Sequence, residues 1–145
     1  MALSDIIIPS EEIAVGKSSF SVRGLNADDV AHLFLSNRAD VERFAALWQI
    51  HDGEVTQDFI AAVLKEVPAL VAQAIACAAD EPAEWEKARK LSIPVQLQAI
   101  NAVGRLTFEG VGVKKFLEGA LLFMQGMTAG FQELSSEAPT TGTGG

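Results

Sequence analysis

The sequence predicts a mainly α-helical domain of about five to seven helices, with an N-terminal β-hairpin and a disordered C-terminal tail. After Gly24, apolar residues recur at the i, i+3, i+4 and i+7 spacing of an amphipathic helix. Before it, apolar and polar residues alternate as in strands. The 145 residues suit one domain. We divide them into an arm (1–11), a hairpin plus helical domain (12–134) and a polar tail (135–145).

The predicted hairpin lies near Glu12–Arg23 and turns at Gly16-Lys17. A two-residue link that begins with glycine fits a type II′ turn, which joins tightly paired strands. An isolated hairpin is marginally stable in water, so we expect it to pack on the helices or to pair with another chain. The alternating apolar residues are Ile13, Val15, Phe20 and Val22.

Capping residues predict where the helices begin. Asn26, Thr56 and Ser92 are each suited to accept a hydrogen bond from the first turn of a helix. Pro68 indicates that one helix ends and another begins there, because proline is tolerated only in a first turn. The expected helices are one after Asn26, one over 41–48, one after Thr56, one over 70–78, a short charged one to Lys90, one over 93–108 and a last long one over 113–131.

Charge and apolar content narrow the classes of partner. The chain has 11 basic and 19 acidic residues, a formal charge of −8, which disfavours nucleic acids and anionic membranes. Hydrophobic residues make up 49%, and this surplus, together with the apolar arm segment Ile6–Ile8, favours a homo-oligomer or another protein partner. No secretory signal and no uncharged run of about 20 residues is present, so we expect a soluble cytoplasmic protein.

Two motifs resemble nucleotide and calcium sites but lack essential residues. Gly16-Lys17-Ser18-Ser19 resembles the end of a phosphate loop, yet Glu11 stands where that loop needs glycine. A calcium loop placed around Gly53 would put Trp48 and Phe59 at ligand positions. We therefore expect a hairpin turn at the first motif and a turn between helices at the second.

No arrangement of residues predicts catalysis or metal binding. His32 and His51 have no carboxylate or cysteine at ligand spacing, and zinc needs three or four ligands. Cys77 lies in a run of small residues and is expected to be buried, although a histidine close to it in space stays possible on the sequence alone. We predict no enzyme activity, no catalytic residues, no metal and no cofactor.

Two stretches together resemble the tail assembly chaperones of long-tailed bacteriophages, also called pre-tape-measure proteins. One runs from Phe20 to Asp29, a strand that leads directly into a capped helix. The other contains Ile93-Pro94-Val95-Gln96-Leu97 and then Gly104-Arg105-Leu106-Thr107-Phe108-Glu109. The resemblance covers about residues 12–131.

The resemblance implies a non-enzymatic chaperone that binds the tape measure protein and keeps it soluble until the tail tube forms around it. It also implies a location in the host cytoplasm and absence from the mature virion. Further possible partners are tail tube protein and a longer, frameshifted form of the chain itself. The tail after Leu134 suits a frameshift junction and an ordinary disordered terminus equally well. The alternative function is a small structural subunit of a phage tail or another assembly.

The last predicted helix carries the candidate site for a partner. Its methionine-rich apolar stripe fits core packing, and it also fits an adaptable face for helical partners. Gly119, Gly126 and Gly130 weaken this helix, so a partner could be needed to order it. The candidate partner-binding residues on or beside the stripe are Val113, Phe116, Leu121, Met124 and Met127.

Overall fold

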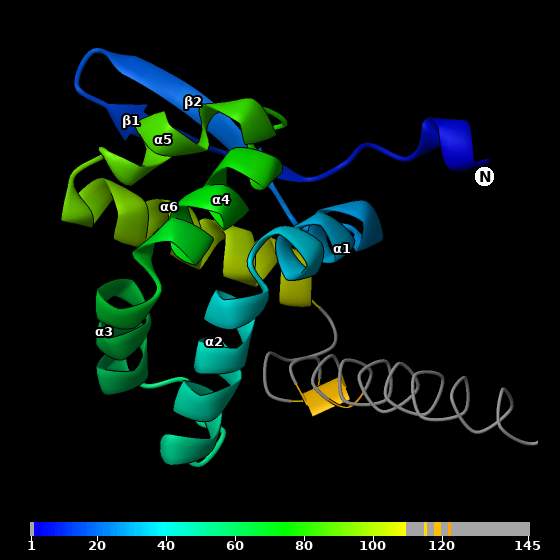
Figure 1. The fold of residues 1–145 in the computed structure, drawn as a ribbon. Coiled ribbons are helices and arrows are strands. Elements are labelled where there is room, and N and C mark those ends of the chain that lie inside the picture. Colours follow the sequence, from blue (N-terminus) through cyan, green and yellow to red (C-terminus); the bar gives the residue numbers. More distant parts are fainter. Residues whose placement is uncertain (1, 110–114, 116–117, 120–121, 123–145) are drawn as a thin grey trace, which may run out of the picture.

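The computed structural model describes residues 2–109, 115, 118–119 and 122. In these residues the chain forms a two-stranded hairpin and six α-helices, which confirms the predicted fold class (Figure 1). The polar tail (135–145) and most of the last predicted helix lie outside the described residues. In order, the elements are η1 (Leu3–Asp5), β1 (Ser10–Val15), β2 (Ser18–Arg23), α1 (Ala27–Ser36), α2 (Arg38–Ile50), α3 (Gln57–Glu66), α4 (Pro68–Ala78), η2 (Pro82–Glu84), α5 (Trp85–Arg89) and α6 (Ile93–Phe108).

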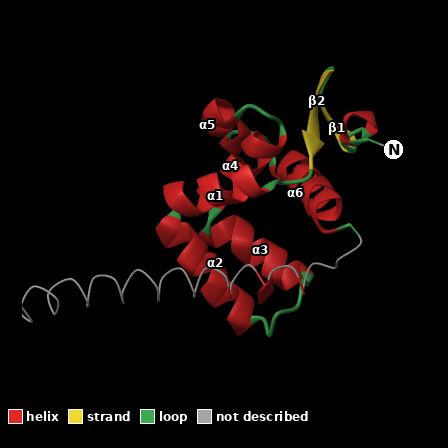
Figure 2. Cartoon of the chain, turned by 90° about the vertical axis from the view of Figure 1, so that its right-hand side faces the viewer, coloured by secondary structure: helices red, strands yellow, loops and turns green. Residues whose placement is uncertain are grey.

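The hairpin packs against the helices of its own chain, which is one of the two arrangements expected from the sequence. β1 and β2 pair antiparallel, with Val15 opposite Ser18, and the turn residue Gly16 has the positive φ (+61°) that a type II′ turn needs. Ile13 and Val22 are completely or almost completely buried in the main core. Figure 2 shows the hairpin beside α6. β1 begins at Ser10, two residues before the expected start.

Two of the three predicted caps are confirmed. The Asn26 side chain accepts a hydrogen bond from the Asp29 N–H, and Asp29 accepts one from the Asn26 N–H. The Thr56 hydroxyl accepts from the Phe59 N–H at 3.2 Å. The prediction for Ser92 was wrong in part, because its side chain makes no capping hydrogen bond although it holds the cap position of α6. Pro94 occupies the second position of α6. The backbone N–H at this position often donates to the side chain of the cap residue, and proline has no N–H.

The main core forms around α4, which is central among the described helices (Figure 1). This helix is rich in alanine, and small side chains allow its neighbours to approach closely. The core joins the buried residues of the hairpin to those of α4 and α6: Ile13, Val22, Val71, Ala72, Ile75, Ala78, Ala88, Ala99, Ala102 and Val103. Residues more than 80 positions apart therefore share one hydrophobic cluster.

Helix α3 ends at Glu66 and α4 begins at Pro68, which confirms the helix boundary predicted there. Within the described part of the chain, no single helix is long and apolar enough to cross a bilayer. Among the described helices, α3 and α4 taken together are the one pair that reaches that length and composition, and they are bent by 98°.

An aromatic cluster, made of Phe44, Trp48, His51 and Phe59, joins α2 to α3. The other three rings meet the ring of Phe59 edge-on, with centroids 5.5–5.7 Å away. The predicted turn after α2 is confirmed, and Gly53 at its end has φ +67° beside the Trp48 ring. The aromatic cluster is therefore built from residues close together in the sequence.

Candidate functional site

The predicted partner-binding stripe cannot be placed. Val113, Phe116, Leu121, Met124 and Met127 all lie outside the described residues. Between 113 and 131 the structure describes Lys115, Glu118, Gly119 and Leu122, all of them helical and exposed. The stripe stays a prediction, both as core and as a partner face.

Arg23, at the end of β2, is the centre of a polar junction that sequence reasoning missed. Its guanidinium donates to Asp29 on α1 at 2.6 Å and to Asp80, just after α4, at 2.6 and 3.0 Å. It also donates to the backbone carbonyl of Cys77 at 3.2 Å, near the negative end of the α4 dipole. The hydrogen bonds to Asp29 and then to Asp80 raise the pKa of the guanidinium further above its ordinary value. One side chain thus ties the hairpin to two helices.

The chain next to Arg23 packs directly on α6. Gly24 lies so close that an added Cβ would stand 2.8 Å from the carbonyl oxygen of Leu106. The Leu25 N–H donates to the Thr107 hydroxyl, which in turn donates to the Val103 carbonyl at 2.6 Å. We call this set of contacts, from Arg23 to Thr107, the hairpin junction. It brings together the two stretches that carry the resemblance to tail assembly chaperones.

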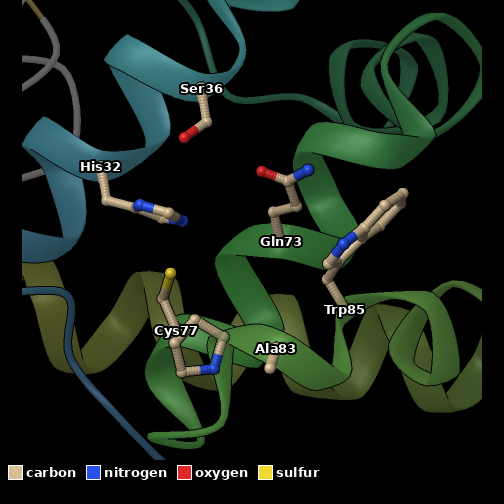
Figure 3. A pocket seen from close by; sticks show the side chains of 7 residues that line it. His32, Ser36, Gln73, Cys77, Ala83 and Trp85 are labelled. Carbon is tan, nitrogen blue, oxygen red and sulfur yellow. The ribbon is translucent and has the colours of Figure 1, made fainter.

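A cleft of about 420 Å³ lies between α1, α4 and the η2–α5 segment (Figure 3). In Figure 3 the labelled side chains surround one open space, with Cys77 and Gln73 from α4 and His32 and Ser36 from α1. The remaining lining residues are Pro82, Ala83 and Trp85. Pro82, Ala83 and the indole of Trp85 make the η2–α5 side of the cleft apolar.

The chemistry of this cleft suits binding better than nucleophilic catalysis. The predicted burial of Cys77 is confirmed, and burial raises the pKa of its thiol, which favours the less reactive protonated form. The structure does bring His32 to the same cleft, but no hydrogen bond joins the two side chains. In the part of the chain that the structure describes, no group of three or more His, Cys, Asp or Glu residues could hold a metal ion.

The two motifs that resemble a phosphate loop and a calcium loop are turns, as expected. Gly16-Lys17 forms the hairpin turn, and His51-Asp52-Gly53 ends α2. His51 packs against Phe59, away from His32, so the two histidines belong to different regions. Sequence reasoning missed the cleft, although one signal was present: Trp85 is flanked by acidic residues in a helix too short to bury it fully.

A second candidate surface is the apolar N-terminal segment. Ile7 is 88% exposed, Leu3 85%, Ile8 63% and Ile6 53%. Buried apolar side chains of this size each contribute about 1.5–3 kcal/mol. The segment therefore offers a partner a substantial apolar contact.

The fold and these surfaces define a small helical domain with an anchored hairpin, an exposed apolar segment and a partly apolar cleft. An exposed apolar segment and a partly apolar cleft are typical of proteins that bind other proteins. A family model described as pre-tape measure protein matches residues 1–141, and the chain belongs to that family. No curated protein and no solved structure matches the chain.

Family membership confirms the resemblance carried by the two stretches of the hairpin junction. It gives the chain a role in phage tail assembly, in a family of assembly chaperones and not of enzymes. The family name associates the chain with the tape measure protein.

Proposed function

We propose that this protein binds the tape measure protein and keeps it soluble while the tail tube assembles. The observation that carries this proposal is the family match over residues 1–141. A tape measure protein is long and helical by the family resemblance, so its chaperone has to cover apolar helix faces before the tube does.

The surface chemistry supports the proposal. Exposed isoleucines in the N-terminal segment supply apolar contact, and the net charge of −8 keeps a complex with an apolar client in solution. We also propose that the stripe Val113, Phe116, Leu121, Met124 and Met127 contributes to the client-binding surface. Several weakly bound copies along one client would gain from multivalency.

Further partners belong to the same proposal. Homo-oligomers, a frameshifted longer form of the chain and tail tube protein fit a chaperone that acts in the host cytoplasm and leaves before the virion is complete. The family match supports an assembly role, and the exposed apolar segment supports self-association or contact with other subunits.

Co-expression with the tape measure protein of the same phage tests the proposal. We expect the tape measure protein to be insoluble alone and soluble with this chain, and the two to co-purify. Insoluble client in both cases would refute the chaperone role. Detection of this chain in purified virions would favour the alternative of a small structural subunit.

Phe116→Ala separates the two interpretations of the stripe. If the stripe is core, the loss is about 3–5 kcal/mol of unfolding free energy and the domain melts earlier. If it is a client surface, the variant stays folded and solubilises less client. Thermal melts beside the co-expression assay distinguish these results, and a variant that is unchanged in both removes Phe116 from both roles.

A further inference from the structure

We propose that the cleft between α1, α4 and the η2–α5 segment receives an apolar side chain of a client helix whose flanking residues are basic. This inference rests on the proposed chaperone function and assigns a site to it. It concerns residues different from the predicted stripe, so the two surfaces can be tested separately.

The size and lining of the cleft fit an apolar anchor. Its volume of about 420 Å³ falls at the lower end of the range of ligand pockets, enough for one or two large side chains. Trp85, Pro82 and Ala83 give it an apolar side, and the polarizable sulfur of Cys77 faces the same space (Figure 3). Leucine, methionine and phenylalanine match this lining.

Exposed carboxylates outnumber cations next to the lining residues of the cleft. Glu81 and Glu84 flank Pro82 and Ala83, and both are exposed. Asp28 lies one turn before His32 on the same side of α1 and is also exposed. None of these three carboxylates takes part in an ion pair among the described residues. The nearest cations on α5, Lys87 and Arg89, each lie one turn after a lining residue, and the exposed carboxylates of Glu81, Glu84, Glu86 and Asp28 outnumber them.

The excess of carboxylates around the cleft favours one kind of partner over another. The chain's own apolar segment Ile6–Ile8 has Asp5 before it and the exposed Glu12 after it, so a second copy would bring carboxylates to an acidic rim. Glu11, which also follows the segment, is paired with Arg105. Like charges that face each other are destabilising, whereas lysine or arginine next to the anchor would pair with Glu81 and Glu84. The acidic rim therefore favours a basic client over self-association at this cleft.

The lining also favours a helix over an extended segment. An extended peptide needs backbone partners, such as a free sheet edge, for its own N–H and C=O groups. The cleft is bordered by helices, so a partner meets side chains there and no free strand edge. Among these side chains, the Ser36 hydroxyl and the His32 imidazole make no hydrogen bond within the described structure. A helix satisfies its own backbone and needs only the apolar anchor and the flanking charges.

Charge-reversed variants in the co-expression assay test the site. Glu81→Lys with Glu84→Lys reverses the rim, and Ala83→Trp fills the cleft from an exposed position. The matched control is Glu42→Lys with Glu54→Lys, which changes the net charge equally at exposed residues away from the cleft. Circular dichroism verifies that each variant keeps its helices.

We expect the rim variant and the filled-cleft variant each to recover at least about tenfold less soluble tape measure protein than the control. Recovery equal to the control in both folded variants overturns the inference and leaves the chaperone function standing. If the unmodified chain does not solubilise the client, the chaperone function and this inference fall together. Raising the salt concentration should weaken the unmodified complex and leave the rim variant almost unaffected, because only the former has ion pairs to screen. Equal salt dependence in both would overturn the assigned role of the rim.

Discussion

The hairpin junction and the aromatic cluster are two ways of joining elements, and they differ in chemistry and in sequence distance. The hairpin junction uses charge and hydrogen bonds, and its Leu25–Thr107 contact spans 82 positions. The aromatic cluster uses ring packing and lies within residues 44–59. Local apolar contacts follow from the helical repeat, whereas distant polar contacts depend on where the whole chain brings each group.

The ion pairs of the two regions also differ in their exposure to solvent. In the hairpin junction the Arg23 and Asp29 side chains are only 17% and 12% exposed, so their pairing is shielded from water. The ion pair between α2 and α3, Arg43 with Glu66, is 3.4 Å long and largely exposed. We therefore expect charge to stabilise the first region and apolar burial to stabilise the second.

The largest effect is expected from Phe59→Ala in the aromatic cluster. Phe59 is 4% exposed and contacts all three other rings, so its removal leaves a cavity and should cost about 3–5 kcal/mol of unfolding free energy. Urea unfolding followed by circular dichroism measures the loss. Leu35→Ala, at a residue 81% exposed, serves as the control and should change stability by less than about 0.5 kcal/mol. Similar results for both variants would mean that ring packing does not hold α2 on α3.

Arg23→Ala comes next and tests whether charge holds the hairpin junction. It leaves the shielded carboxylate of Asp29 without a cation, although the Asn26 N–H still donates to it, and should cost about 3 kcal/mol. Arg43→Ala is the matched control in the other region and should cost at most about 1 kcal/mol, since exposed ion pairs contribute little. Equal losses in chemical denaturation would remove the proposed contrast between the two regions.

The same contrast explains what the sequence could predict. Asn26, Thr56, Pro68 and the Gly16 turn act through neighbours within a few residues, and all four predictions are confirmed. Ser92 shows the limit of such rules, because the proline two positions later removes a donor that the rule assumes.

Contacts over long sequence distances were not predictable in the same way. Nothing in the local pattern indicated that Arg23 pairs with Asp80, 57 positions away. The pairing of Arg23 with Asp29, six positions away, was missed for another reason, because Asp29 was interpreted through the dipole of its own helix. The cleft was missed because its lining comes from residues 32 to 85 on four elements. The predicted stripe lies outside the described residues and stays a prediction.

Gly24→Ala probes the close packing of the hairpin junction on α6. The new Cβ would stand 2.8 Å from a backbone oxygen that cannot easily move, and we expect a loss of about 1–3 kcal/mol. Gly104→Ala is the control on α6 itself, where an added Cβ meets nothing within 4 Å. It should stabilise the protein by about 0.5–1 kcal/mol, because alanine favours a helix interior. Opposite signs in thermal or urea unfolding are the expected result, and two losses of similar size would contradict it.

The smallest effect is expected from Asp80→Asn, and it separates charge from geometry in the hairpin junction. Asp80 has φ +60°, which asparagine also tolerates, so the backbone should be preserved. Hydrogen bonding from Arg23 lowers the pKa of the Asp80 carboxyl below its ordinary value of 3.8. Because the folded-state pKa is the lower one, the stabilisation is present above pH 3.8 and is lost as the pH falls through the folded-state pKa.

The Asp80 side chain is 70% exposed, so solvent screening limits the gain to about 0.2–1 kcal/mol near neutral pH. Urea midpoints of the unmodified chain and of Asp80→Asn should therefore differ near pH 7 and converge below pH 3.8. Added salt should reduce the difference near neutral pH, because an exposed pair is screened. A difference that persists unchanged at low pH would assign the contribution of Asp80 to its backbone conformation, and the charge in this junction would then rest on Arg23 and Asp29.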